Sequence, residues 1–181
     1  VLAMRVARAV DRAPYDTQEA AFARIATAVG KYWVCRRAPG FVNEAQECLG
    51  GAGYVEESML PRLYRQAPLN SIWEGSGNIQ CLDVLRALQR DPRTGLVLLA
   101  ELEAASQLDP DLDAEIAELR PVLEGKSRPG EVEARRWVEA LALALQASLL
   151  LRNGSPVAAA CWATRIGGDP GKACGTRPRA L

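Results

Sequence analysis

The chain has 181 residues, of which 49% are hydrophobic and 24% charged, an ordinary composition for a globular protein with one core. Its 22 basic and 22 acidic side chains cancel and no segment is strongly basic, so composition alone argues neither for nor against nucleic-acid binding. It contains no histidine, which excludes every Ser-His or Cys-His mechanism within this chain.

The hydrophobic pattern is helical from the first residue. Residues 1–10 have the pattern of the middle of an amphipathic helix, so we expect a truncated product or an expressed fragment. A second helix is predicted from Thr17 to Arg37, where Pro39-Gly40 should end it. Spacings of three and four predict that its buried stripe comprises Phe22, Ile25, Val29, Tyr32 and Trp33.

A short helix should run from Phe41 to Leu49. It is expected to stop at Gly50-Gly51, because glycine tolerates the left-handed backbone that follows many helix ends. Residues 54–69 are predicted to be a loop with one short helix, which Ser58 would cap. From Ser76 the pattern is helical again, with a buried face expected at Ile79, Leu82, Leu85 and Leu88.

The second half of the chain is also predicted to be helical. Asp109 is a plausible N-cap, with Pro110 in the first turn of the helix that follows it. Further helices are expected over residues 94–107, 110–124, 131–152 and 156–166. No strand pattern and no internal repeat appear in the sequence. The predicted fold class is therefore all-α, an antiparallel helical bundle with a C-terminal helical extension.

The five cysteines form no CxxC pair, and their number is odd. A disulfide framework or a metal site is therefore not expected, and reduced thiols predict a cytoplasmic protein. No apolar stretch approaches the roughly 20 residues that a membrane span needs, so we expect no membrane association.

Residues 70–80, Asn-Ser-Ile-Trp-Glu-Gly-Ser-Gly-Asn-Ile-Gln, contain the candidate chemistry. Glu74 is a candidate base, because Trp73 would shield its carboxylate from water and Gly75 would leave room for a substrate. A glutamate beside a tryptophan is also often a simple surface acid, so both interpretations stay open. Ser76 and Asn78 open a helix, where they cap it or leave N–H groups free for phosphate.

Three glycines, Gly50, Gly51 and Gly53, follow the predicted helix that ends near residue 49. They serve as a helix stop and a turn, and their backbone N–H groups can also hold an anion such as a pyrophosphate. The spacing is not G-x-G-x-x-G and no strand precedes it, so a Rossmann site is not supported.

Residues 47–54 and 70–80, about twenty residues apart, together resemble the C-terminal domain of the acyl-CoA dehydrogenases, which are FAD flavoproteins. The resemblance implies that Glu74 abstracts the α-proton of an acyl-CoA thioester while flavin N5 takes the β-hydrogen as hydride. It also implies FAD contacts, across a subunit interface for the glycines, by Gly50, Gly51, Gly53, Ser76 and Asn78. The commoner family residues at the last two positions are Thr and Gln.

Residues 32–40 and 56–65 resemble the AidB branch of this family, flavoproteins of the bacterial adaptive response to DNA alkylation. That branch has a helical extension, so we expect a dehydrogenase C-terminal domain over 1–90 and the extension over 91–181. The branch is linked to double-stranded DNA binding, for which the candidates here are Arg86, Arg90, Arg135, Arg136, Arg152 and Arg165. Charged helix faces are usually only solvated, and the acidic residues of 91–130 would have to face away.

The resemblance implies a homo-oligomeric oxidoreductase, a dimer or a tetramer, that acts on an acyl-CoA substrate. One alternative is a DNA-binding alkylation-response flavoprotein with little dehydrogenase activity, and another is a structural fragment that makes only oligomer contacts. In the family, an N-terminal and a middle domain hold most of the flavin and the acyl chain, and neither is in this chain. We therefore expect this chain alone to bind FAD weakly or not at all and to be inactive.

Overall fold

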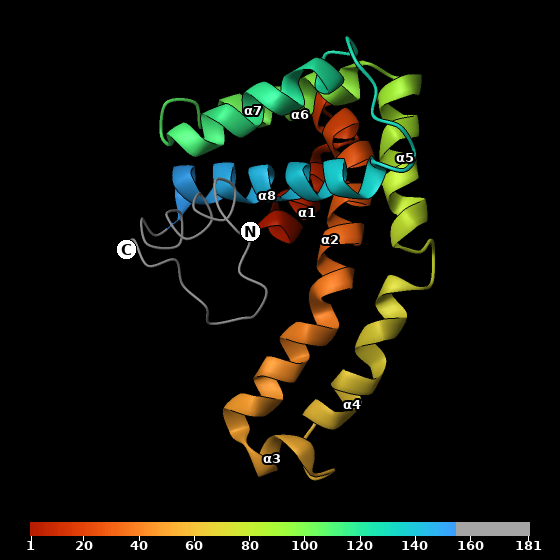
Figure 1. The fold of residues 1–181 in the computed structure, drawn as a ribbon, viewed down its shortest axis with the longest axis vertical. Helices are drawn as coiled ribbons and strands as arrows, with labels where there is room; N and C mark the ends of the chain where they lie inside the picture. The colour runs from red at the N-terminus through yellow and green to blue at the C-terminus, as the bar shows by residue number, and fades with distance from the viewer. Residues whose placement is uncertain (155–181) are drawn as a thin grey trace.

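Every secondary-structure element that the computed structural model describes, over residues 1–154, is a helix (Figure 1). The predicted all-α fold is confirmed. The elements are α1 (Leu2–Arg12), α2 (Thr17–Leu49), α3 (Gly51–Tyr54), α4 (Leu60–Gln66), the 3-10 helix η1 (Ala67–Ser71), α5 (Gly77–Arg90), α6 (Arg93–Glu103), α7 (Pro110–Leu123) and α8 (Ala134–Asn153). Helices α2 and α5 run side by side, and α6, α7 and α8 lie across them (Figure 1). The predicted helix over 156–166 lies outside the described residues.

Helix α2 continues unbroken to Leu49, so the predicted end at Pro39-Gly40 and the separate helix over 41–49 are wrong. Proline removes one helical hydrogen bond, but packing can outweigh that loss. Here α3, α4 and η1 all contact α2. At the other end of α2, Asp16 rather than Thr17 is the N-cap, because its carboxylate accepts hydrogen bonds from two backbone N–H groups in the first turn.

One apolar core draws side chains from six helices, α1, α2, α5, α6, α7 and α8. The predicted stripe of α2 is buried throughout. Spacings of three and four also predict a stripe on α7, which is buried, and one on α8, which is buried except for the partly exposed Trp137 near its start. The prediction fails in the first turn of α5, where Ile79 is 47% exposed. The fully buried face of α5 is instead displaced by one to two residues and comprises Cys81, Val84 and Ala87.

The second half of α2, with α3, α4 and η1, projects away from this core as a long hairpin (Figure 1). We call residues 36–71 the arm. The stretch predicted as a loop with a short helix therefore contains two short helices, α4 and η1. Ser58 does not cap α4, because Met59 is the N-cap residue and the Ser58 hydroxyl is buried without a hydrogen-bond partner among the described residues.

The helices beyond residue 90 follow the predicted pattern closely. The carboxylate of Asp109 caps α7 by accepting from the Leu112 N–H at 2.9 Å, as predicted. Helix α6 ends at Glu103, four residues before the predicted end, and Gln107 lies in the left-handed region with φ 67°. No helix within residues 1–154 has both the length and the apolar character needed to cross a bilayer.

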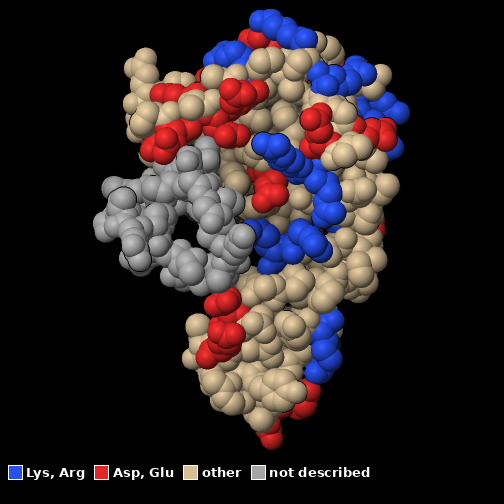
Figure 2. All heavy atoms as spheres, in the orientation of Figure 1, with Lys and Arg blue, Asp and Glu red and all other residues tan. Residues whose placement is uncertain are grey.

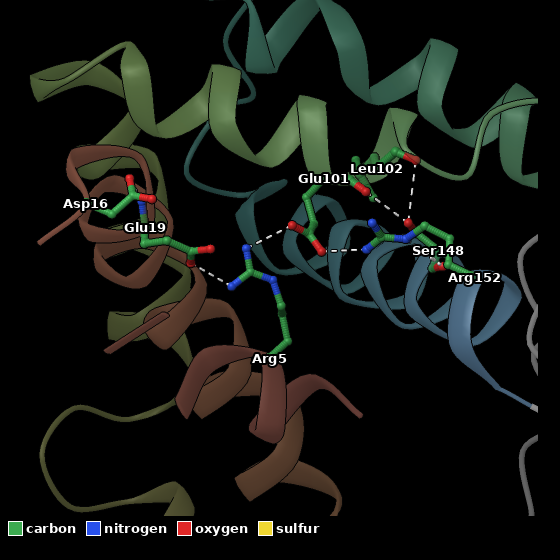
Figure 3. A network of polar contacts seen from close by, with 7 residues as sticks. All are labelled: Arg5, Asp16, Glu19, Glu101, Leu102, Ser148 and Arg152. Atoms are coloured by element: carbon green, nitrogen blue, oxygen red, sulfur yellow. Dashed lines mark hydrogen bonds and ion pairs between the residues drawn. The ribbon is translucent and has the colours of Figure 1, made fainter. Parts of the chain in front are cut away.

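A half-buried polar network joins helices from both ends of the described chain (Figure 3). The Arg5 guanidinium donates to Glu19 at 2.7 Å and to Glu101 at 2.9 Å, and Arg152 donates to Glu101 at 2.5 Å. The hydroxyl of Ser148 donates to the backbone carbonyl of Glu101 at 3.0 Å. Burial raises the pKa of the Glu101 carboxyl, but the hydrogen bonds from the two arginines outweigh it and hold the pKa below its usual value.

Candidate active site

The candidate base lies in a tight turn between η1 and α5. Glu74 has φ 55° and Gly75 has φ 103°, so two successive residues adopt positive φ. For a residue with a side chain, the left-handed region costs roughly 1–2 kcal/mol. Such a conformation persists only where surrounding contacts hold it in place.

Two side chains from outside the turn provide those contacts. The ammonium group of Lys31 on α2 donates to the carbonyl oxygens of Asn70 at 2.6 Å and of Trp73 at 3.0 Å. The Gln80 amide on α5 donates to the carbonyl oxygen of Glu74 at 3.0 Å and more weakly to that of Gly75 at 3.4 Å. The backbone on either side of the candidate base is therefore fixed from two different helices.

Sequence reasoning assigned no role to Lys31 or Gln80. Lys31 is one of only three lysines in a chain whose other basic residues are arginines, which is the one feature that distinguishes it. Its partners lie 39 and 42 residues further along the chain, so no local pattern could predict the contact. Gln80 lies inside the 70–80 segment itself, but its contact with the turn depends on how α5 begins, which the motif alone does not show.

The Glu74 side chain is exposed, and Trp73 beside it is 55% exposed. Within one copy of the described chain the indole does not cover the carboxylate. Gly75 is required for a reason other than substrate access, because a Cβ there would lie 2.6 Å from the Gln80 amide nitrogen and its φ disfavours any side chain. The turn thus presents a carboxylate on a rigid backbone toward open space.

Helix α5 begins directly after this turn, with Ser76 at its N-cap position. The Ser76 side chain makes no capping hydrogen bond, so the first N–H groups of the helix have no side-chain partner among the described residues. Ser76 and Asn78 are both exposed. Between them, a Cβ on Gly77 would lie 3.3 Å from the Tyr32 ring and 3.9 Å from the Arg135 guanidinium. The start of α5 therefore combines open N–H groups with a nearby cation, an arrangement that suits an anion.

Two side chains near the start of α5, Cys81 and Tyr32, are buried and unreactive. Burial raises the pKa of the Cys81 thiol to about 11, so the thiol is protonated at neutral pH. Burial likewise raises the pKa of Tyr32, despite the opposing effect of Arg135. Neither group is a nucleophile. No cluster of three or more His, Cys, Asp or Glu side chains suited to a metal ion occurs among residues 1–154.

The three predicted cofactor-binding glycines lie at the tip of the arm. Gly50 has φ 57° and its N–H donates to Glu47, so the predicted helix stop is confirmed. Gly53 packs against α2, where a Cβ would approach the Gln46 carbonyl oxygen to 2.4 Å. Gly51 begins α3 with open space around it.

The tip of the arm and the Glu74 turn are far apart in one chain. Lys31, which contacts the turn, precedes Gly50 by 19 residues of continuous helix, a distance of about 28 Å at 1.5 Å per residue. The structure therefore brings Glu74, Ser76 and Asn78 together but not the three glycines.

The arginines proposed for DNA fall into three groups. Arg86 and Arg90 on α5 and Arg135 and Arg136 at the start of α8 are exposed, and these two helices contact each other. Figure 2 shows basic side chains where α8 begins beside α5, and acidic side chains over α7. Arg152 belongs instead to the network with Glu101. Arg165 lies outside the described residues.

A family model for the acyl-CoA dehydrogenase C-terminal domain matches residues 1–89. The chain therefore belongs, through these residues, to the acyl-CoA dehydrogenase family.

Among curated relatives, the chain is 42% identical over 161 residues to the putative acyl-CoA dehydrogenase AidB of Escherichia coli (strain K12). That alignment covers 89% of this chain and 29% of AidB. Acyl-CoA dehydrogenase family member 11 of Caenorhabditis elegans is 46% identical over 68 residues, which is 38% of this chain and 11% of that protein. The chain thus spans less than a third of the length of the relatives that it matches.

The fold has a counterpart among solved structures. The crystal structure of Caenorhabditis elegans ACDH-11 in complex with C11-CoA superposes with a TM-score of 0.72 and 24% sequence identity. The match covers 91% of this chain and 32% of the ACDH-11 chain. The arrangement of helices on both sides of residue 90 is therefore one that a larger acyl-CoA dehydrogenase also contains.

Proposed function

We propose that this chain forms the C-terminal part of an FAD-dependent acyl-CoA dehydrogenase in which Glu74 is the base. Its carboxylate would take the α-proton of an acyl-CoA thioester as the carbon–carbon double bond forms between the α and β carbons. FAD, when bound, would accept the β-hydrogen with its electron pair as hydride. The observation that supports this most strongly is the Glu74 turn, whose backbone is held by Lys31 and Gln80 while the carboxylate has no partner among residues 1–154.

The residues at the start of α5 suit the phosphates of this cofactor. Open N–H groups, with Ser76 and Asn78 beside them, would receive a pyrophosphate, and Arg135 lies close enough to neutralise part of its charge. Gly50, Gly51 and Gly53 would contact a second FAD molecule, because they lie about 28 Å from the turn in the same chain. A complete FAD site then needs residues from two copies and from the parts of the relatives that this chain does not span.

We further propose that the arm is the surface through which copies assemble, as a dimer or a tetramer. It carries four basic and four acidic residues, so two arms would not repel each other. Its large apolar side chains are exposed to a degree that isolated soluble domains rarely tolerate. These side chains are Phe41, Leu49, Tyr54, Val55, Met59, Leu63, Tyr64 and Leu69. The chain alone would bind FAD weakly or not at all. Its proposed location is the cytoplasm.

The substitution Glu74→Gln in the complete protein tests the role of the base. It keeps the size of the side chain and removes the proton acceptor, so kcat for acyl-CoA oxidation should fall by at least about 100-fold. The flavin absorbance per subunit should stay the same, because the backbone contacts of the turn remain. Glu118→Gln, at an exposed glutamate on α7 and outside the arm, is the control and should leave kcat unchanged. Equal rates for the two variants would exclude Glu74 as the base.

A second candidate function, binding of double-stranded DNA, is supported by one observation. Arg86, Arg90, Arg135 and Arg136 project from two helices that contact each other, and the acidic side chains gather over α7 (Figure 2). If they contact phosphates, Arg136→Gln should weaken binding equally for different DNA sequences and reduce the slope of log affinity against log salt by about one. Arg62→Gln, on the arm, should leave the slope unchanged. A salt-independent affinity would rule out phosphate contacts.

A further inference from the structure

A groove of about 340 Å³ lies where the turn between α1 and α2 meets the end of α5 and the start of α6. Three arginines, Arg24, Arg90 and Arg93, stand along it. The uncharged lining, which we call the floor, consists of the small side chains of Ala13, Ala20, Ala21 and Ala87 with two threonines, Thr17 and Thr94. The proposed dehydrogenase chemistry uses none of these residues.

Two of the three arginines are held in place by carboxylates. Arg24 donates both terminal nitrogens to Asp83, at 2.7 and 3.0 Å, and Arg93 donates to Asp91 at 2.8 Å. Arg90 makes no hydrogen bond or ion pair with any residue between 1 and 154, although it is exposed at the edge of the same groove. The groove thus has two guanidinium groups that pair with carboxylates and one, that of Arg90, with no such partner among residues 1–154.

The charge along the groove is positive. Of its lining residues three are basic and one, Asp91, is acidic. Asp83 does not line the groove. It pairs with Arg24, and the charges of Arg86 and Arg90 also act on its carboxylate. An anion in the groove would therefore meet an excess of positive charge close to Arg90.

Guanidinium groups match the oxygens of a phosphate in a fork geometry. The floor is mostly alanine and the Thr94 hydroxyl already donates to the Asp91 carbonyl oxygen, so the floor suits the apolar or flat part of an organic molecule. A volume of this size lies within the range of small-molecule sites.

We propose that this groove binds a small organic phosphate, with the phosphate at Arg90 between Arg24 and Arg93 and the organic part over the alanines. The groove is separate from the proposed cofactor contacts, because Gly77 and Arg90 are the first and last residues of α5. Thirteen residues of helix separate them by about 20 Å. The proposal does not depend on the dehydrogenase activity.

Isothermal titration calorimetry of the 181-residue chain with AMP as the probe tests this proposal. AMP should bind at least tenfold more tightly than adenosine, which lacks the phosphate, and more tightly than inorganic phosphate, which lacks the organic part. Affinity for AMP equal to that for adenosine would overturn the role of the arginines. Affinity equal to that for inorganic phosphate would overturn the role of the alanine floor.

Three variants locate the binding site. Arg90→Gln should weaken AMP binding at least tenfold, and Ala20→Leu should do the same by filling the floor without changing the charge. Arg135→Gln, at the opposite end of α5, is the control and should leave AMP affinity unchanged. Loss of binding in the Arg135 variant but not in the Arg90 variant would move the site to the start of α5 and refute the proposal. Circular dichroism of each variant confirms that it is folded.

Discussion

At the scale of single residues, the turn at Glu74 depends on contacts made at long range. Lys31 and Gln80 hold the carbonyl groups around it, and the carboxylate is left without a partner among residues 1–154. This explains why sequence reasoning identified the acid but not what positions it. A sequence motif shows which side chains are present. The backbone conformation of this turn is instead set by α2 and α5, which pack on either side of it.

Replacing Gly75 with alanine should disturb this turn. The φ of 103° and a Cβ only 2.6 Å from the Gln80 amide predict a loss of about 1–2 kcal/mol in the free energy of unfolding. In the complete protein the rate of acyl-CoA oxidation should fall as well, since the carboxylate would move. Urea denaturation and steady-state kinetics measure the two effects.

Gly40→Ala is the matched control for that experiment. Gly40 lies within α2 and a Cβ there would meet nothing within 4 Å, so alanine should stabilise the chain by about 0.5–1 kcal/mol. If both alanine variants had the same stability, the strained turn would not be what requires glycine at position 75.

At the scale of helices, the sequence predicted faces better than it predicted ends. The buried stripes of α2, α7 and α8 follow from spacings of three and four, which packing onto one core preserves. The predicted end of α2 was wrong because Pro39 favours a helix end only through its local effect on the backbone. The contacts from α3, α4 and η1 come from residues further along the chain, and no local signal shows them. Ile79 was wrong for the same reason, since the first turn of α5 belongs to the exposed Glu74 region rather than to the core.

The arm makes the clearest prediction at this scale. Tyr54 is 79% and Met59 69% exposed near its tip, so Tyr54→Lys with Met59→Lys should prevent two arms from packing together. In the complete protein the double variant should sediment as a smaller species and carry less flavin, because the proposed FAD site needs two copies. Analytical ultracentrifugation and the flavin absorbance measure both.

Tyr15→Lys controls for charge and exposure alone. Tyr15 is 91% exposed but lies in the turn between α1 and α2, far along the chain from the arm. The Tyr15→Lys variant should sediment like the unaltered protein. An unchanged sedimentation coefficient for the arm variant would show that another surface holds the copies together.

At the scale of the whole molecule, the boundary predicted at residue 90 does not divide the core. Helices α6 and α8 pack onto α2 and α5, and α7 packs onto α6 and α8, all in one apolar cluster. Ion pairs among Arg5, Glu19, Glu101 and Arg152 also link the two halves. The two-domain prediction follows from the resemblance, which assigns residues 1–90 to the dehydrogenase domain and residues 91–181 to the helical extension of one branch of the family. The division into two domains remains a prediction, and the shared core implies that the described helices unfold together.

The Glu101 network gives that idea a measurable pH dependence. The pKa of the Glu101 carboxyl is below its usual value in the folded chain, so its ionised form stabilises the fold above the unfolded pKa of about 4.3 and the contribution is lost as the pH falls through the folded pKa. Glu101→Gln should therefore lower the free energy of unfolding at pH 7 by about 1–3 kcal/mol, less than the loss of a fully buried pair partner. The difference in the free energy of unfolding between the variant and the unaltered chain should become steadily smaller below about pH 4.

Glu103→Gln separates this effect from the general loss of a carboxylate. Glu103 pairs with Arg120 on the surface, where both side chains are about 40% exposed, so water and salt screen the interaction. The Glu103→Gln variant should have nearly the same free energy of unfolding as the unaltered chain at every pH. Urea denaturation between pH 3 and pH 7 compares the three proteins. If the deficit of the Glu101 variant stayed constant across that range, the ionised carboxylate would not be what joins the two halves, and the apolar contacts of α6 and α8 would account for the coupling by themselves.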